Sequence, residues 1–463
     1  MELLIAELSR YVIIILFTIY TFCCFRVFVG KTQERKESVF HAQRTLTVLL
    51  HILCSALLIM QYKELKYAIL FALQLAFYLV FVRIYQIFYK GLSKLVFNNM
   101  MMCMMIGFIM LGRLDYKYAI RQLVMASIAM GVCLLVPLFI ERFSIWEKLG
   151  WQYALVGILL LMLVFVIGVE QYGATNWISV GGITLQPSEF VKIIYVFFIS
   201  AMLSKTTRFK HIVVITAVAA IHVIILVAEK DLGAALIYFI TYLVMLYVAT
   251  MKISYLFAGL GAGTVAAIVA HKLFSHVQTR VIAWQDPWSH INDQGYQICQ
   301  SLFAIGTGGL FGMGLGQGLP KSVPVVESDF IFAAISEELG VVFSVCLLFV
   351  YISSYIMFVN IAMKMKKKFY KLTAFGLSVV FIFQVFLCIG GVTKFIPSTG
   401  VTLPLISYGG SSIISTIVIF SIIQGMYVLN GREEEERLER EQEDHVGHEG
   451  ERRKKRKTRQ ETK

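Results

Sequence analysis

Long apolar runs alternate with short polar segments along most of the chain. The runs are rich in Leu, Ile, Val, Phe and Met, and many are about 20 residues long, enough to cross a bilayer as an α-helix. A transmembrane β-barrel would show short alternating segments instead. The pattern predicts an all-α polytopic membrane protein with about 13 transmembrane helices. The expected spans are 11–30, 45–61, 66–89, 97–113, 119–140, 149–170, 187–204, 211–229, 232–250, 253–274, 329–361, 372–393 and 410–429.

The run 329–361 is longer than one crossing needs, so we expect it to include a tilted or broken end. Basic residues concentrate in the loops of one side, which the positive-inside rule assigns to the cytoplasm. We therefore expect a multi-pass protein of the cytoplasmic membrane, with its N-terminus outside and its C-terminus in the cytoplasm. The outer side then holds three long, Gly-containing segments, at 171–186, 275–328 and 394–409.

Composition agrees with a membrane protein. Hydrophobic residues make up 58% of the chain and charged residues 15%, against about a quarter charged in soluble domains. The net charge is +13, and the basic residues lie in short loops between the apolar runs. This distribution is typical of topology signals and of contacts with anionic lipid headgroups, and it argues against nucleic-acid binding. The eight Cys lie mostly inside apolar runs, without metal-ligand spacing. The tail 431–463 has an acidic block followed by a basic one, which predicts disorder.

The segment "NWISVGGITLQPSEFVK", 176–192, contains a helix start. Pro187 suits a first turn, and Glu189 suits the positive end of the helix dipole. Glu189 and Lys192 are three residues apart and share a helix face. They form either a capping acid with a snorkelling lysine or an ion pair that faces an internal cavity.

The loop 275–328 concentrates further polar groups between apolar runs. It carries Arg280, the stretch "WQDPWSHINDQGYQ" and the glycine run "GTGGLFGMGLGQG". The glycine run lacks the G-K-[ST] of a phosphate-binding P-loop. Asp329 and Glu338 follow, at the start of the next span, where acids are costly unless they are paired or face water.

The segment "TKFIPSTGVTLPLISYGGSS", 393–412, is typical of irregular backbone that lines a cavity. Together, the outer segments predict one polar cavity that opens outward, with acids suited to proton transfer and cations suited to a phosphate. A transporter could use the same acids and cations, so these residues alone do not distinguish an enzyme from a transporter.

Four motifs, in this order and spacing, resemble the SEDS family (shape, elongation, division and sporulation proteins, such as RodA, FtsW and SpoVE). They are "NWISVGGITLQPSEFVK", "GYQICQSLFAIGTGGLFGMGLG", "DFIFAAISEELG" and "PSTGVTLPLISYGGSS". The resemblance implies a ten-helix core at 93–430, with a large outer loop before its eighth helix. Residues 1–92 form a three-helix extension of the core, and 431–463 form the charged tail.

The resemblance implies a peptidoglycan glycosyltransferase that polymerises lipid II outside the cytoplasmic membrane, in division, elongation or sporulation. Members usually act with a class B penicillin-binding protein, which cross-links the glycan. The donor would be the growing chain, whose leaving group is a lipid pyrophosphate, and the acceptor would be the 4-hydroxyl of the GlcNAc in the next lipid II. The alternatives are a lipid II flippase and a non-catalytic scaffold for the penicillin-binding protein. A divalent cation beside the pyrophosphate is chemically reasonable.

By motif, Glu189 and Lys192 look like a buried polar pair of the family. The remaining expected substrate-binding residues, which lie around the predicted cavity, are Arg280, Gln297, Asp329, Glu338, Lys394, Ser398 and Ser411.

The chain departs from the family at its catalytic acid. Members typically have an acid shortly before "GYQ", taken as the base, and ungapped counting puts His290 there. The base is then Asp286, or Asp293 after a local shift, or His290 itself, whose pKa suits proton transfer. A fourth alternative is a chain that has lost catalysis and kept a scaffold role. Asp and Asn also favour turns, which explains part of this crowding.

Overall fold

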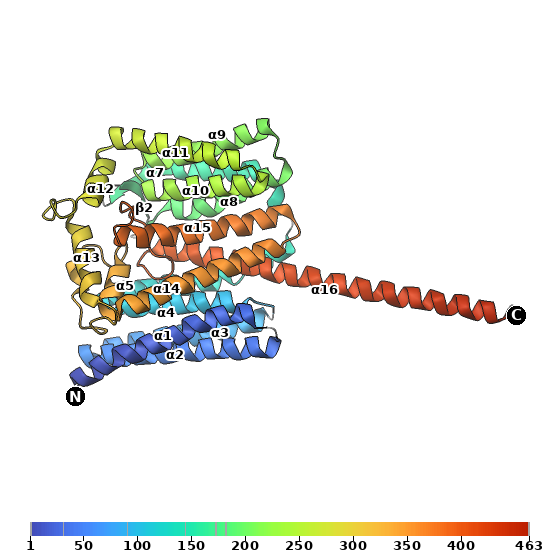
Figure 1. The fold of residues 1–463 in the computed structure, drawn as a ribbon, viewed down its shortest axis with the longest axis horizontal. Coiled ribbons are helices and arrows are strands. Elements are labelled where there is room, and N and C mark those ends of the chain that lie inside the picture. The colour runs from blue at the N-terminus through green and yellow to red at the C-terminus, as the bar shows by residue number, and fades with distance from the viewer. Residues whose placement is uncertain are drawn as a thin grey trace.

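The computed structural model describes residues 2–30, 32–89, 91–143, 145–171, 174–180 and 183–461. In this part of the chain, thirteen helical spans are long and apolar enough to cross a membrane. They run roughly along one direction in a single bundle (Figure 1). The predicted all-helical, multi-pass membrane architecture is confirmed.

The helices of the first half, in chain order, are α1 (Glu2–Val29), α2 (Gln33–Tyr62), α3 (Leu65–Phe88), α4 (Lys94–Leu114), α5 (Tyr116–Cys133), α6 (Val136–Arg142), η1 (Ile145–Lys148) and α7 (Gly150–Ile167). Those of the second half are α8 (Pro187–Lys205), α9 (Phe209–Ala228), α10 (Leu232–Thr250), α11 (Ile253–Leu273), α12 (Ser275–Gln285), α13 (Tyr296–Gly308), η2 (Pro320–Ser322), α14 (Ile331–Lys364), α15 (Lys368–Val392) and α16 (Gly410–Glu461).

Two spans are broken. The span predicted at 119–140 consists of α5 and α6, and Pro137 stands in the first turn of α6, where its missing N–H is harmless. Within α14, Gly340 has a φ of +85°, so the broken end expected for 329–361 is confirmed. A Cβ at Gly340 would lie 2.4 Å from the backbone nitrogen of Gly312, so only glycine fits.

A small antiparallel sheet folds part of the outer segment between α7 and α8. Its strands are β1 (Gly168–Gln171), β2 (Ala174–Val180) and β3 (Ile183–Leu185), in the order β1-β2-β3. In its register, Ile178 pairs with Gly168 on one side and with Leu185 on the other. The hydropathy pattern does not predict these short strands. Their pairing satisfies backbone polar groups at the edge of the apolar bundle.

The helices α1–α3, here called the N-terminal module, pack against α4 and α14. Asn99 of α4 lies at the centre of a buried polar contact between them. Its Oδ1 accepts a hydrogen bond from Tyr20 of α1 (3.0 Å), and its Nδ2 donates to Ser353 of α14 (2.8 Å). Because such groups are costly in apolar surroundings unless paired, they fix how the module docks. The proposed division at residues 92 and 430 stays a prediction.

The two ends of the bundle differ (Figure 1). The helices α12 and α13, the small sheet and the N-terminus lie at one end, and α16 projects from the other. This relative placement is the one that the charge pattern predicts, whereas the side that faces the cytoplasm stays a prediction. The backbone of α16 is helical as far as Glu461, and the disorder predicted for 431–463 stays a prediction.

Candidate functional site

A buried ion pair joins Glu189 and Lys192 in the first turns of α8. The Lys192 Nζ lies 2.5 Å from the Glu189 Oε2 and donates to the Gln384 Oε1 of α15 at 2.8 Å. The hydroxyl of Ser415 in α16 donates to the same Glu189 oxygen at 2.7 Å. Lys192 is only 2% exposed. The pair therefore ties three helices together in the apolar bundle, and its expected role in substrate binding stays a prediction.

The segment 393–409 and the start of α16 continue this polar region towards the outer end. The Gln384 Nε2 donates to the carbonyl of Thr402 (3.2 Å), and the hydroxyls of Thr402 and Ser412 lie 2.7 Å apart. The Ser411 hydroxyl accepts from the backbone N–H of Gln186 at 2.9 Å, which fixes the entry into α8. Ser411 thus positions the backbone before Glu189.

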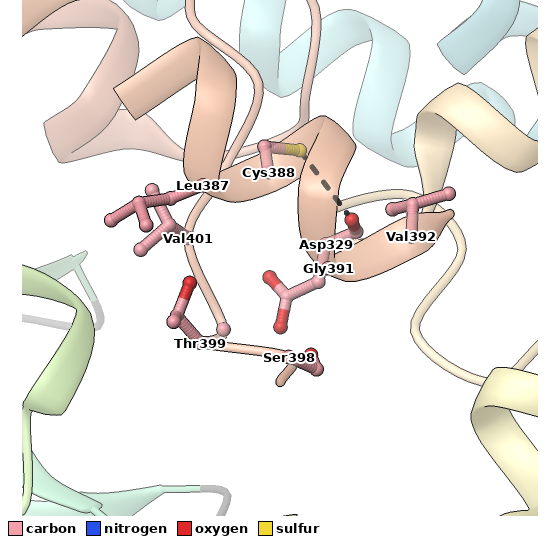
Figure 2. Close-up of a pocket in the computed structure, with 9 residues that line it drawn as sticks. Asp329, Leu387, Cys388, Gly391, Val392, Ser398, Thr399 and Val401 are labelled. Atoms are coloured by element: carbon pink, nitrogen blue, oxygen red, sulfur yellow. Dashed lines mark hydrogen bonds between the residues drawn. The ribbon is translucent and has the colours of Figure 1, made fainter. Parts of the chain in front are cut away.

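A small open pocket lies beside this segment, where the chain enters α14 (Figure 2). The structure lines it with Asp329, Leu387, Cys388, Gly391, Val392, Ser398, Thr399, Gly400 and Val401. Its empty volume of about 160 Å³ includes the solvent at its mouth, and it encloses no room for a water molecule. The carboxylate of Asp329 points into it, towards Ser398 and Thr399. The Thr399 hydroxyl is buried without a hydrogen-bond partner. The Asp329 carboxylate and the Thr399 side chain thus line a shallow notch that is open to solvent.

Arg280 of α12 lies beside this pocket. Its Nη1 donates to the carbonyl of Ser398 at 3.2 Å. An ideal Cβ at Gly400 would lie 3.5 Å from the Asp329 Oδ2 and 3.6 Å from the Arg280 Nη2, so both groups face the space beside this glycine. Burial raises the pKa of Asp329. The hydrogen bond from Ser328 and the charge of Arg280 lower it by less, so the pKa lies above its ordinary value. Of the predicted residues, Arg280, Asp329 and Ser398 therefore come together.

The loop with the expected base is mainly a series of turns. The Asp286 Oδ1 accepts from the backbone N–H of Ser289 (3.2 Å), and the backbone carbonyl of Asp286 contacts the His290 Nδ1 (3.1 Å). Asp286 and Asp293 are exposed, and His290 is half-buried. Hydrogen bonding to Ser289, and then the charges of His290 and Lys394, lower the pKa of Asp286.

Gln297 follows this loop in the chain, and Lys394 lies near it in space. The backbone carbonyl of Lys394 accepts from the Trp284 indole N–H at 3.2 Å, which connects α12 with the segment 393–409. Lys394 is half-buried, with a φ of +60°. Gln297 is exposed on α13. Substrate binding by either side chain stays a prediction.

Glu338 lies in a separate, closed cluster. Its Oε1 pairs with Arg113 of α4 at 2.9 Å, and its Oε2 accepts from the backbone N–H of Gly316 at 3.0 Å. Arg113 also donates to the carbonyl of Gly318 at 3.0 Å. Glu338 is 0% exposed. The structure therefore does not bring Glu338 together with Asp329, and places it under the glycine run.

Asp231, which the site prediction did not include, organises the sheet side of the site. Its Oδ2 accepts from Asn176 (2.8 Å), Gln186 (2.9 Å) and Ser188 (3.1 Å), and its Oδ1 caps α10. In the sequence, Asp231 stands directly before an apolar run, and an acid in that position is typical of a helix cap. Arg113 was also missed, and its signal was a single charge that ends an apolar run.

Within the described residues, no three His, Cys, Asp or Glu side chains are grouped to hold a metal ion. A divalent cation held by the substrate's own phosphates stays a prediction.

A family model for FtsW, RodA and SpoVE, described as a cell cycle protein, matches residues 93–429. The chain belongs to this family, the SEDS family. It is 36% identical over 347 residues to the peptidoglycan glycosyltransferase RodA of Mycobacterium bovis, which covers 69% of this chain and 74% of that protein. It is 33% identical over 326 residues to the stage V sporulation protein E of Bacillus subtilis, covering 66% and 87% respectively.

Solved structures give the same relationship. The chain is similar to a chain of a peptidoglycan synthase complex that coordinates polymerization and crosslinking, with a TM-score of 0.61 and 26% identity, covering 72% of this chain and 96% of that one. The rod shape determining protein RodA of Thermus thermophilus matches with a TM-score of 0.55 and 26% identity, covering 72% and 95%.

All candidate site residues lie inside the range that matches the SEDS family. The N-terminal module lies outside that range and contacts its glycine run. Gln61 donates to the carbonyl of Gly316 at 2.7 Å, and Arg10 donates to the carbonyl of Gly312 at 3.1 Å. In this SEDS protein, residues before the family core therefore help to hold a loop of the core.

Proposed function

We propose that the chain is a peptidoglycan glycosyltransferase that polymerises lipid II at the outer face of the cytoplasmic membrane. The observation that carries this proposal is the pocket at one end of an apolar bundle, where Asp329, Arg280 and Ser398 come together. Membership of the SEDS family, whose relatives include named peptidoglycan glycosyltransferases, supports it.

The reaction needs a carboxylate, cations and an apolar surface in one place. A carboxylate takes the proton of the acceptor hydroxyl as a general base. Cationic side chains stabilise the pyrophosphate that leaves the donor, and Arg280 and Lys394 are the cations near the pocket and the loop. Apolar helix faces suit the lipid tails. The buried pair of Glu189 and Lys192 lies deeper in the same polar region and is our proposed wall of the substrate site.

The proposed partner is a class B penicillin-binding protein, which would cross-link the glycan. The similarity to a chain of a peptidoglycan synthase complex supports a partner of this kind. The proposed orientation puts α12, α13 and the N-terminus outside and α16 in the cytoplasm, since the loops at the other end carry the basic residues.

Purified full-length protein, with and without a partner transpeptidase, tests the proposal with fluorescent lipid II as the probe. We expect glycan polymer on gels, insensitive to moenomycin as the SEDS resemblance implies. Transfer of labelled lipid II across vesicles without polymer would support the flippase alternative. Binding of the transpeptidase with neither polymer nor transfer would support the scaffold alternative, to which the histidine at position 290 points.

A further inference from the structure

We propose that the Trp284 indole and the Lys394 backbone carbonyl form a latch that positions the loop 286–293 for the glycosyl transfer. This inference rests on the proposed function, since all three candidates for its general base lie in this loop. It assigns a positioning role to Trp284, which acts through the loop rather than by touching substrate. The latch joins the end of α12 to the segment 393–409, across 110 positions of the chain.

The helices that lead into the loop are weakly attached to the bundle. No residue of α11 is buried, and α12 buries only Ala283. The loop itself projects from the end of the bundle, between α12 and α13 (Figure 1). A segment with few buried apolar contacts opens locally at low cost. The position of the loop therefore depends on the polar contacts that α12 makes with its neighbours.

Two side chains of α12 donate to backbone carbonyls of the segment 393–409. The Trp284 Nε1 donates to the carbonyl of Lys394 at 3.2 Å. The Arg280 Nη1 donates to the carbonyl of Ser398, also at 3.2 Å. Trp284 is the last residue but one of α12, so its bond acts directly on the start of the loop. Arg280 lies one turn earlier and beside the pocket, which makes Trp284 the cleaner residue for a test.

The loop is also attached to α13. Pro287 is buried, and its carbonyl accepts from the Cys299 Sγ at 3.3 Å. A Cβ at Gly295 would lie 2.3 Å from the same carbonyl oxygen, so only glycine allows this approach. One attachment alone would leave the loop free to rotate about it. The bond at Trp284 supplies a second attachment on the other side of Asp286, and two fixed points set the direction of the loop.

The backbone conformation of Lys394 presents the carbonyl to the indole. Lys394 follows the cap of α15 with a φ of +60°, a left-handed conformation that glycine adopts more easily than lysine. In this turn the N–H of Phe395 donates to the carbonyl of Gly390 at 2.8 Å. The lysine combines two contacts with the loop, since its carbonyl holds Trp284 and its charge lies near Asp286.

The first test compares two substitutions of Lys394 in the full-length protein with its transpeptidase. Lys394→Gly and Lys394→Val both remove the ammonium group. Glycine adopts the left-handed turn readily, whereas valine, which is branched at Cβ, opposes it and should displace the carbonyl. We expect Lys394→Val to polymerise fluorescent lipid II about 10-fold more slowly than Lys394→Gly, because the loop loses its catalytic geometry. The loss should lie in kcat, with KM changed by less than about 2-fold.

The second test removes the donor of the same bond. Trp284→Phe keeps an aromatic ring and loses the indole N–H, so kcat should again fall about 10-fold with little change in KM. Hydrogen exchange of residues 275–293 should rise in Trp284→Phe and in Lys394→Val, and stay near wild type in Lys394→Gly. Trp151→Phe is the matched control. Trp151 is exposed at the start of α7, so its substitution should change neither the rate nor the exchange.

The outcomes separate the latch from the proposed function. Equal rates and equal exchange in Lys394→Gly and Lys394→Val would overturn the latch and leave the proposed function intact. So would a Trp284→Phe protein within about 3-fold of the wild-type rate and with unchanged exchange. A rise in KM in place of the fall in kcat would assign Trp284 to substrate binding and overturn its positioning role. Absence of polymer from wild type would overturn the proposed function, while the exchange measurements, which need no activity, would still decide whether this bond holds the loop.

Discussion

Asp329 and Glu338 stand nine positions apart at the entrance to one helix, yet their surroundings differ. Glu338 is fully buried, pairs with Arg113 and accepts from the backbone of Gly316. Asp329 faces an open pocket, with Arg280 across the space beside Gly400. A carboxylate whose bonds are complete holds structure, and one that faces a pocket is open to further contacts. The hydropathy pattern shows only that acids enter an apolar span, and the fold decides which of them closes a buried cluster and which faces a pocket.

The largest effect on stability is expected at the closed cluster. Arg113→Ala leaves Glu338 as an uncompensated buried charge, and removal of one partner of a buried pair costs about 3–5 kcal/mol of unfolding free energy. The double variant Arg113→Met with Glu338→Leu should recover part of this loss. Recovery should be incomplete, because the backbone groups of Gly316 and Gly318 lose their partners.

Unfolding of the purified protein in detergent, followed by denaturant titration, measures this effect. Arg121→Ala is the control, since Arg121 is exposed on α5 and its loss should change stability by less than about 0.5 kcal/mol. Equal stability of the Arg113 and Arg121 variants would mean that the closed cluster does not hold the fold.

A smaller effect is expected where the N-terminal module holds the glycine run. Gln61→Ala removes the hydrogen bond to the carbonyl of Gly316, at a cost of about 1 kcal/mol. Arg113 still donates to that carbonyl at 3.3 Å, which limits the loss. Hydrogen exchange of residues 309–318 should rise in this variant. Gln33→Ala is the control, since Gln33 is exposed on the same helix. Equal hydrogen exchange of residues 309–318 in both variants would mean that the N-terminal module does not hold the loop.

The sequence predicts the features that depend on local pattern. Apolar runs predict the thirteen spans, and the excess length of 329–361 predicts its break. The spacing of Glu189 and Lys192 predicts one shared face, and the structure forms the pair. The SEDS motifs predict the family before any fold is known.

The remaining features depend on residues far apart in the chain. Arg113 and Glu338 are 225 positions apart, and one donor to Asp231, Asn176, lies on a short strand that carries little hydropathy signal. The loop 286–293 attracts attention by its density of polar residues, but much of that polarity closes turns. Only the packing of α12 against the segment 393–409 shows that Arg280 faces Asp329.

The most direct test measures polymerisation and unfolding together, in the full-length variants Asp329→Asn and Glu338→Gln. The account predicts opposite profiles. Asp329→Asn should unfold like wild type and polymerise lipid II about 10-fold more slowly, because Arg280 loses the negative charge beside it. Glu338→Gln should unfold more easily and keep most of its activity per folded molecule. An Asp329→Asn protein that polymerises normally, beside an equally stable but inactive Glu338→Gln protein, would contradict the placement of the substrate site at the open pocket.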